Sequence, residues 1–209
     1  MAAHLRIYST LRTQPWKTGY HFTIGNYLRL RLPEIIPENQ VLYLDSDTLI
    51  ISPIDDLFLT DLTTNVLAGV LDPVGVGSSR VPRAPLDPYL NTGVLLMNLD
   101  QLRKDQFIDK CIDLYQRYEN DIVWVDQCLI NKYAEGKKLV LSEQWNYQIF
   151  SNSIDQRIFD AITLDGSAAI LHFVGDVKPW QERCNPMVAK IWQSYATQLD
   201  ACWQPLKEA

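Results

Sequence analysis

The stretch VLYLDSDTLI, residues 41–50, is an apolar run that ends in two aspartates separated by one serine. Alternate residues of an extended segment point to the same side, so we expect Asp45 and Asp47 to converge where the strand ends. Ligands of open α/β sheets bind at that carboxyl end. Two carboxylates held close together repel each other, and a hard divalent cation such as Mg²⁺ or Mn²⁺ relieves the repulsion while leaving positions for phosphate oxygens. The pair therefore points to metal-bridged diphosphate binding.

Two other interpretations of this pair are open. In the first, one aspartate caps the next turn and the other is solvated, which is the commoner situation for so short a motif taken alone. In the second, the first aspartate is the nucleophile of a phosphatase of the haloacid-dehalogenase class. That class has a threonine two residues after the second aspartate, where this chain has Leu49, so the phosphatase interpretation is weakened.

Outward from this stretch, short strand-like runs alternate with longer helical patterns, which is typical of a layered α/β domain. Near-continuous apolar runs suit central strands that are covered on both faces. The chain has 209 residues, 47% of them hydrophobic and 21% charged, which favours one soluble globular domain because domains average about 100–200 residues. The expected strands cover residues 41–45, 66–72, 93–99, 138–142 and 168–174.

Helix signals lie between these strands. Ser52, followed by a proline, is expected to cap a short helix. Asp100 is expected to cap a longer helix through residues 101–118, on which Arg103 and other charges form a solvated face.

Two further segments complete the chain. Residues 74–89 are rich in glycine, serine and proline and are expected to form a long loop. Loops such as this one are expected to select the sugar and the acceptor. Residues 187–203 have the spacing of a closing amphipathic helix.

Composition excludes several classes of protein. The net charge of -6 and the isoelectric point near 5.0 argue against nucleic-acid binding. The apolar runs are shorter than a membrane span or a signal peptide requires, so we expect a cytoplasmic protein without a transmembrane segment. Cysteine spacing indicates neither a zinc site nor a disulfide framework, so reduced thiols are expected at Cys111, Cys128, Cys184 and Cys202.

Several blocks occurring in order are more specific than the aspartate pair. They are YLRLRLPEIIPENQVLYLDSDTLI, LNTGVLLMNLDQLR, VDQCLINKYAEGKKLVLSEQWNY and ILHFVGDVKPW. Together they strongly resemble glycosyltransferase family 8 over roughly residues 20–182. The resemblance implies the GT-A fold, an α/β architecture with a mixed, mostly parallel sheet flanked by helices. It also implies a retaining transferase that moves a hexose from a UDP-sugar to a saccharide or lipid-linked saccharide acceptor.

The resemblance assigns a metal site. Asp45 and Asp47 match the metal-binding pair of the family, and His172 matches its third ligand. An imidazole beside two carboxylates suits Mn²⁺ better than Mg²⁺. Taken alone, a histidine at the end of an apolar strand is more often a hydrogen-bonded core residue, and only the surrounding block favours the metal.

The resemblance also assigns donor contacts. Ser46 lies between the two metal-binding aspartates, and Arg29 matches an arginine that grips the donor. Lys178 and Gly175 match contacts to the diphosphate, where a cation and a close backbone approach complement the departing charge. For Arg29 and Lys178, the alternative is a solvated surface position.

The remaining assignments concern the sugar. Asn91 and Thr92 match a turn against the transferred sugar, Asp126 and Gln127 match a pair that faces the anomeric centre, and Asp72 matches a residue on the acceptor side. Without the resemblance, Asn91 belongs to an ordinary turn, and Asp126 has about even odds of being a helix N-cap. The implied mechanism is attack of the acceptor oxygen from the face that the diphosphate leaves. Gln127 would support the positive charge on the sugar or stand near it as a nucleophile.

The chain departs from the family at its start. Family members begin with a strand that carries an Asp/Asn/Tyr-rich turn for uracil and ribose, whereas here the segment HLRIYST, residues 4–10, lacks these polar groups. We therefore expect one domain over residues 1–209 with an N-terminally shortened fold, divergent residues 1–20, and a C-terminal helix and tail at 183–209. The alternative function is that of a truncated, non-catalytic relative that binds sugar or a partner protein without turnover.

Overall fold

The computed structural model describes residue 16 and residues 23–150 and 168–207. The chain divides into two compact units, of which unit 1 comprises Met1–Leu44 and Ile54–Trp145 and unit 2 comprises Asp45–Pro53 and Asn146–Ala209. Among the residues described, no helix has the length and apolar character needed to cross a membrane. The segment HLRIYST and most of the divergent N-terminus lie outside the described residues.

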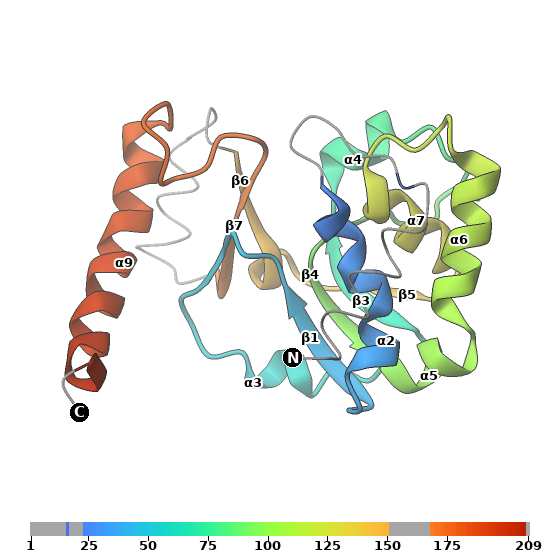
Figure 1. Cartoon of the computed structure of the whole chain (residues 1–209), viewed down its shortest axis with the longest axis horizontal. Coiled ribbons are helices and arrows are strands. Elements are labelled where there is room, and N and C mark those ends of the chain that lie inside the picture. Colours follow the sequence, from blue (N-terminus) through green and yellow to red (C-terminus); the bar gives the residue numbers. More distant parts are fainter. Residues whose placement is uncertain (1–15, 17–22, 151–167, 208–209) are drawn as a thin grey trace. The chain divides into compact units, whose positions relative to one another are not determined.

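Unit 1 is built on a four-stranded sheet in the order β1-β4-β3-β5 (Figure 1). Strand β4 lies antiparallel to both β1 and β3, and β5 lies parallel to β3. The strands span Gln40–Leu44 (β1), Leu67–Leu71 (β3), Leu90–Asn98 (β4) and Lys138–Val140 (β5).

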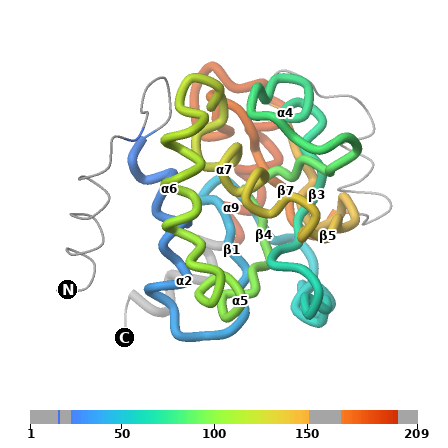
Figure 2. The backbone as a smooth tube through the Cα atoms, turned by 90° about the vertical axis from the view of Figure 1, so that its right-hand side faces the viewer, coloured from blue at the N-terminus to red at the C-terminus, as the bar shows by residue number. Residues whose placement is uncertain are grey.

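Helices cover one face of this sheet, and Figure 2 shows α2, α5, α6 and α7 in front of the strands. Successive residues of β4 point to opposite faces: Leu95 and Met97 pack against the helices, and Leu96 packs on the other face with Leu62 and Ala68. The helices are η1 (Ile24–Arg31), α2 (Leu32–Ile35), α3 (Asp55–Phe58), α4 (Pro73–Ser78), α5 (Leu99–Lys104), α6 (Phe107–Tyr118) and α7 (Val125–Tyr133).

Unit 2 contains a three-stranded sheet in the order β2-β7-β6. Strand β2 (Thr48–Ile50) lies antiparallel to β7 (Ile170–Val174), and β6 (Tyr147–Phe150) lies parallel to it. A short 3₁₀ helix, η2 (Glu143–Asn146), precedes β6, and the long helix α9 (Pro186–Lys207) ends the described chain. The rings of Phe173 and Trp192 meet edge to face at 5.5 Å, so α9 and β7 share one apolar core.

The five predicted strands and the mixed sheet are confirmed, but the predicted excess of parallel pairs is not found among the described strands. Three of the described pairings are antiparallel and two are parallel. The antiparallel pairs are β1–β4, β3–β4 and β2–β7, so β4 runs against both of its neighbours. Strands β2 and β6 were not predicted, because strands of three and four residues are too short to show a hydrophobic periodicity.

The predicted helix caps are wrong in two places. Helix α3 begins after Ile54, and the Ser52 hydroxyl instead donates to the Ala168 carbonyl at 3.5 Å. Asn98 caps α5 by accepting from the Gln101 N–H at 3.0 Å, and Asp100 lies in the first turn.

Two predicted segments, one helix and one loop, are each shorter in the structure than the sequence predicts. The helix expected through 101–118 is broken into α5 and α6 at Gln106, whose φ of 52° lies in the left-handed region. The loop expected at 74–89 begins with α4, so only residues 79–89 form the loop. The closing helix is confirmed as α9.

Arg103 is not on a solvated face as predicted, because its guanidinium binds carbonyls of α2 and of the residues that follow it. Its Nε donates to Pro33 O at 2.7 Å and its Nη2 to Glu38 O at 2.8 Å, and Nη2 also donates to Ile36 O. One side chain on α5 therefore holds a segment that lies 65 to 70 residues earlier in the chain.

We expect Arg103→Lys to lower the free energy of unfolding by about 2 kcal/mol, because an ammonium group cannot reproduce the planar, forked donation of a guanidinium to several carbonyls. Urea denaturation measures the loss. Lys104→Gln is the matched control, since Lys104 forms an exposed pair with Asp100 and such pairs contribute about 0–1 kcal/mol. Equal losses in the two variants would contradict the bridging role of Arg103.

Candidate functional site

Asp45 and Asp47 lie in a tight turn before β2, not in the extended segment that the sequence predicts. The Thr48 N–H and hydroxyl both donate to Asp45 O, at 3.2 Å and 2.7 Å. The Phe173 N–H donates to Asp47 O at 2.9 Å. The turn is thus closed on itself and tied to β7, and Ser46 is exposed at its tip.

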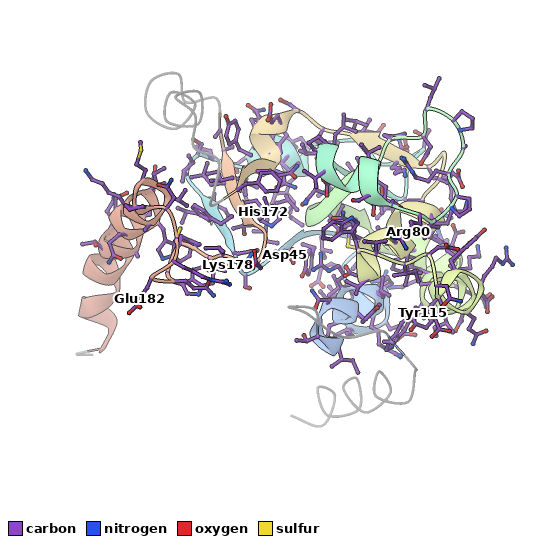
Figure 3. The ribbon with its side chains drawn as sticks, turned by 90° about the horizontal axis from the view of Figure 1, so that it is seen from above. Asp45, Arg80, Tyr115, His172, Lys178 and Glu182 are labelled. Atoms are coloured by element: carbon purple, nitrogen blue, oxygen red, sulfur yellow. The ribbon has the colours of Figure 1, made fainter. Side chains whose placement is uncertain are left out.

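Strand register places His172 beside this turn, because β2 and β7 pair Thr48 with His172. The His172 Nε2 atom lies 3.4 Å from Asp47 Oδ1 and 3.9 Å from Asp45 Oδ2. One ligand atom from each of the three residues lies within 4.8 Å of the others. Figure 3 shows Asp45, His172 and Lys178 gathered in one place. Asp45, Asp47 and His172 could together hold a metal ion, and this candidate site is called the metal centre below.

Asn146 orients the histidine of the metal centre. Its Oδ1 lies 2.9 Å from His172 Nδ1, and the asparagine is fully buried. Because Nδ1 is held by Asn146, Nε2 faces the carboxylates and is the nitrogen available to a metal, which is the arrangement of metal-bound histidines. Sequence reasoning missed Asn146, because nothing short of the β6–β7 pairing indicates that it meets a residue 26 positions later.

Lys178 holds the second oxygen of Asp47. Its Nζ donates to Asp47 Oδ2 and, at 2.9 Å, to Phe173 O. Burial raises the pKa of Asp47, but hydrogen bonds and charges from His172 and Lys178 outweigh burial and hold that pKa well below its usual range. Asp47 is therefore ionised, with Oδ1 turned toward His172 and Oδ2 toward Lys178.

The donor set fits a divalent cation. Two carboxylates and one imidazole are ligands that Mn²⁺ accepts, and ligand distances of about 2.1 Å can be met within the spacing of these atoms by small side-chain movements. Gly175 follows β7 with a φ of 93°, which favours glycine, and a side chain built there would meet nothing within 4 Å. The backbone after β7 is thus open to a ligand.

The second group of predicted residues lies in unit 1 and is described separately. Arg29 and Asp126 form a buried ion pair, with Nε and Oδ2 3.0 Å apart and side chains 5% and 4% exposed. Arg29 Nη1 also donates to Thr92 O at 2.6 Å. Trp124, not Asp126, occupies the N-cap position of α7, so the capping interpretation of Asp126 is wrong. The surface alternative for Arg29 is wrong because its side chain is buried.

Gln127 has both ends of its amide engaged. Its Oε1 accepts from the Thr92 N–H at 3.0 Å and lies 3.3 Å from the Thr92 hydroxyl. Its Nε2 donates to Asp72 Oδ2 at 2.9 Å, while Asp72 Oδ1 caps α4. Asn91 and Thr92 lie within β4 and not in the turn that the resemblance implies, and Asn91 Oδ1 accepts from the Gly93 N–H at 2.9 Å. The structure therefore brings Asp72, Thr92 and Gln127 into one hydrogen-bonded network.

The structure thus groups the predicted residues by unit. Asp45, Asp47, His172, Lys178 and Gly175 belong to unit 2. Arg29, Asp72, Asn91, Thr92, Asp126 and Gln127 belong to unit 1. Cys111, Cys128 and Cys184 are buried and form no disulfide within the described part of the chain; the side chain of Cys202 lies outside it.

The mixed α/β fold and an Asp-x-Asp turn beside a histidine are features of a GT-A glycosyltransferase. The sequence model of glycosyl transferase family 8 matches residues 5–184. The chain therefore belongs to glycosyltransferase family 8.

Individual relatives agree with this assignment. Glycosyltransferase GlyE of Streptococcus pneumoniae serotype 4 is 30% identical over 181 residues, which cover 84% of this chain and 41% of GlyE. The chain thus spans less than half the length of this relative. The crystal structure of GlyE superposes with a TM-score of 0.65 at 28% identity, covering 85% of this chain and 44% of that one. The galactosyltransferase LgtC, solved with donor and acceptor sugar analogues, superposes with a TM-score of 0.73 at 25% identity, covering 88% of this chain and 70% of LgtC.

We expect Asn146→Ala to weaken Mn²⁺ binding by about 10- to 100-fold, because without a partner for Nδ1 neither the orientation nor the tautomer of the His172 ring is fixed. Isothermal titration of Mn²⁺ measures the affinity. Gln193→Ala, which alters an exposed side chain of α9 in the same unit, is the control. Unchanged affinity in Asn146→Ala would show that Asn146 does not orient the histidine.

The depressed pKa of Asp47 predicts a pH-dependent contribution to stability. A lowered folded-state pKa stabilises the fold above the unfolded value of about 3.9, and this contribution is lost as pH falls toward the folded value. In metal-free buffer, the stability difference between wild type and Asp47→Asn is expected to shrink by about 1 kcal/mol between about pH 5 and about pH 3.

Urea denaturation at the two pH values measures this difference. Asp176→Asn, which removes one partner of an exposed ion pair with Arg183, is the control and is expected to change stability little at either pH. A difference for Asp47→Asn that stays constant between the two pH values would contradict the assigned charge state.

Proposed function

We propose that this chain acts as a retaining, metal-dependent hexosyltransferase that moves a sugar from a UDP-sugar to a hydroxyl of a saccharide or lipid-linked saccharide. The observation that carries the proposal is the convergence of Asp45, Asp47 and His172 beside Lys178, in a chain of family 8. The donor and acceptor sugar analogues bound to LgtC support the substrate class.

In unit 2, Asp45, Asp47 and His172 would hold Mn²⁺ or Mg²⁺. The metal supplies charge neutralisation for the diphosphate when it is bound. Lys178 adds a second positive charge and, because its Nζ already touches Asp47 Oδ2, it is held in place before the donor arrives. The open backbone at Gly175 takes a diphosphate oxygen, and Ser46 lies at the exposed tip of the Asp45–Asp47 turn. These residues stabilise the leaving group as the bond to the sugar breaks.

In unit 1, Gln127 is the residue nearest to the anomeric carbon in our proposal. Its carbonyl oxygen is oriented by Thr92 and its NH₂ group by Asp72, so a fixed dipole supports the positive charge that develops on the sugar. A side-chain amide is a poor nucleophile. The acceptor hydroxyl is therefore proposed to attack from the face that the diphosphate leaves, without a covalent intermediate.

The other residues of unit 1 orient the donor sugar and the acceptor. Asp126 and Asn91 are proposed to bind sugar hydroxyls, and Asp72 to accept from the reacting hydroxyl of the acceptor. Arg29 is proposed to act on the donor by holding Asp126 and the Thr92 carbonyl, because its guanidinium is buried against both. A buried charge pair of this kind is oriented before substrate binds.

Titration of UDP into the protein, with and without Mn²⁺, tests the donor site. We expect metal-dependent binding that weakens by more than about 100-fold in Asp47→Ala, since a lost ligand costs more than a lost outer partner. Glu182→Ala is the matched control, an exposed acidic residue of unit 2 that Figure 3 labels away from the metal centre. It is expected to bind UDP like wild type.

Release of UDP from a panel of UDP-hexoses then tests transfer. Gln127→Ala is expected to lower kcat by about 100-fold or more while UDP affinity is kept, because its dipole acts in the transition state. Absence of UDP binding with and without Mn²⁺ would contradict the proposal and favour a non-catalytic relative that binds sugar or a partner protein.

A further inference from the structure

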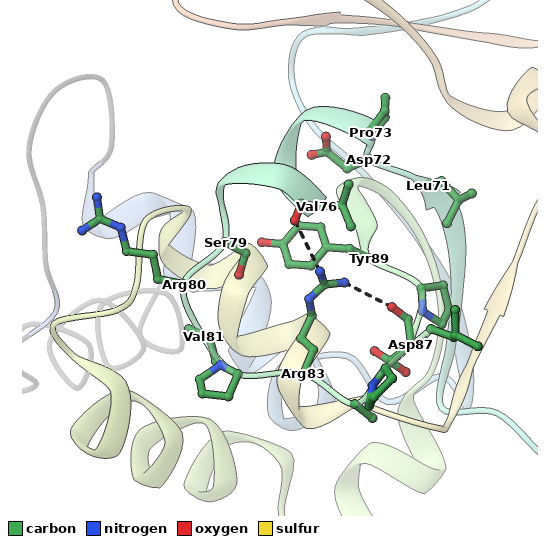
Figure 4. Close-up of a pocket in the computed structure, with 15 residues that line it drawn as sticks. Leu71, Asp72, Pro73, Val76, Ser79, Arg80, Val81, Arg83, Asp87 and Tyr89 are labelled. Atoms are coloured by element: carbon green, nitrogen blue, oxygen red, sulfur yellow. Dashed lines mark hydrogen bonds between the residues drawn. The ribbon is translucent and has the colours of Figure 1, made fainter.

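A pocket of about 590 Å³ lies in unit 1 between α4 and the loop of residues 79–89, and we call it the α4 pocket (Figure 4). Its volume lies within the range of about 300–1,000 Å³ that is usual for small-molecule sites. Its walls are mainly apolar. The apolar lining residues are Leu71, Pro73, Val76, Val81, Pro82, Ala84, Pro85, Leu86, Pro88 and Tyr89.

Large hydrophobic side chains are unusually exposed at this pocket. Leu71 is 47% exposed, Val76 is 42% exposed, and Leu86 at the loop tip is fully exposed. Exposed apolar groups that gather around a cavity mark a binding surface, whereas scattered ones need no explanation. Leu86 also has a φ of 66°, a conformation that is unfavourable for leucine and that the rest of the loop must hold in place.

The loop is held rigidly from behind. Asp87 forms a buried ion pair with Lys138, with Oδ2 and Nζ 2.6 Å apart and side chains 5% and 1% exposed. Its Oδ1 accepts from the Gly136 N–H at 3.0 Å, and the Ala84 N–H donates to the Glu135 carboxylate. Three prolines between residues 82 and 88 further restrict the backbone. The pocket is therefore formed before any ligand binds.

Arg83 crosses from the loop to α4. Its guanidinium donates to Asp87 O at 3.1 Å and to Val76 O at 3.3 Å, as Figure 4 shows. Asp72 and Asp87 are engaged with backbone N–H groups and other side chains, and Arg80 extends away from the other lining residues in Figure 4. Because the charged groups of the wall are engaged with other groups or, in the case of Arg80, extend away, the pocket suits an uncharged apolar ligand.

Asp72 connects the pocket to the sugar network. It lines the α4 pocket and accepts from Gln127 Nε2 at 2.9 Å. A molecule whose hydroxyl lies at Asp72 therefore has the apolar pocket directly beside it.

We propose that the α4 pocket binds the aglycone of the acceptor, and that the aglycone is an uncharged aryl or alkyl group joined to the acceptor sugar. The proposal rests on the proposed transferase function and adds the chemical class of the acceptor. The sugar hydroxyl lies at Asp72, and the aglycone packs against Leu71, Val76 and the loop.

Paired glycosides test this assignment. Binding of phenyl and methyl β-glucoside, and of phenyl and methyl β-galactoside, is measured by titration calorimetry with UDP and Mn²⁺ present. We expect the phenyl compound of at least one pair to bind about tenfold more tightly than its methyl counterpart, because the ring removes apolar surface from water in the pocket.

Variants locate the effect. Val76→Ser is expected to reduce the phenyl preference about threefold or more, since it removes apolar contact without filling the pocket. Leu59→Ser is the matched control, because Leu59 is 80% exposed in unit 1 and does not line the pocket; its phenyl preference is expected to equal that of wild type. Leu71→Ser, expected to act like Val76→Ser, guards against a fold defect in one variant.

The UDP titration separates this inference from the proposed function. Metal-dependent UDP binding without a phenyl preference, or with a preference that Val76→Ser and Leu71→Ser both leave intact, overturns the aglycone site and leaves the transferase proposal standing. Absence of UDP binding overturns the transferase proposal and, with it, the acceptor role of the pocket, even if phenyl glycosides bind. Failure of every glycoside to bind also overturns the aglycone site.

Discussion

Burial of β4 on both faces is the constraint on which unit 1 depends. The strand pairs with β1 on one edge and with β3 on the other, and its alternate side chains fill separate apolar clusters. Its first residues then serve as fixed points for polar groups. Leu90 exchanges two hydrogen bonds with the Asn131 side chain. The Thr92 carbonyl accepts from Arg29, and the Thr92 N–H donates to Gln127. The apolar packing of one strand therefore determines where the charged and amide groups of α7 and η1 lie.

Unit 2 meets a different requirement, which is to keep two carboxylates close together. Lys178 and His172 each contact one oxygen of the Asp47 carboxylate, and Asn146 orients the histidine by contacting its other ring nitrogen. The same lysine is proposed to contact the diphosphate, so its ion pair with Asp47 both stabilises the turn and holds a cation ready. Such double use is expected where a site must be ordered before its substrate binds. The α4 pocket of unit 1 is built differently. There, buried charges such as Asp87 and Lys138 hold a loop whose exposed surface is apolar.

Much of the fold and part of the candidate site could be predicted because the signals are local. Five strands follow from apolar runs, and the closing helix from its periodicity. The convergence of Asp45, Asp47 and His172 follows from the family blocks and not from spacing: the backbone of Asp45–Asp47 is a turn, so the argument from alternate residues reached the right pair through the wrong geometry. The cap at Asp100 failed because Asn98, two residues earlier, takes the cap position. The cap at Ser52 failed because α3 begins only after Ile54, without a side-chain cap.

The sequence by itself determined the family, the α/β class and the residue types of the metal centre, because these depend on ordered blocks and on side-chain chemistry. Tertiary structure alone decided what each polar group contacts. Arg29 and Asp126 lie 97 positions apart in the chain and pair only because η1 and α7 pack together. Asn146 reaches His172 only through strand pairing, Arg103 meets the end of α2 only across the fold, and Asp87 finds Lys138 only behind the loop. Contacts between distant segments depend on how apolar surfaces pack, and no local pattern of residues records that packing.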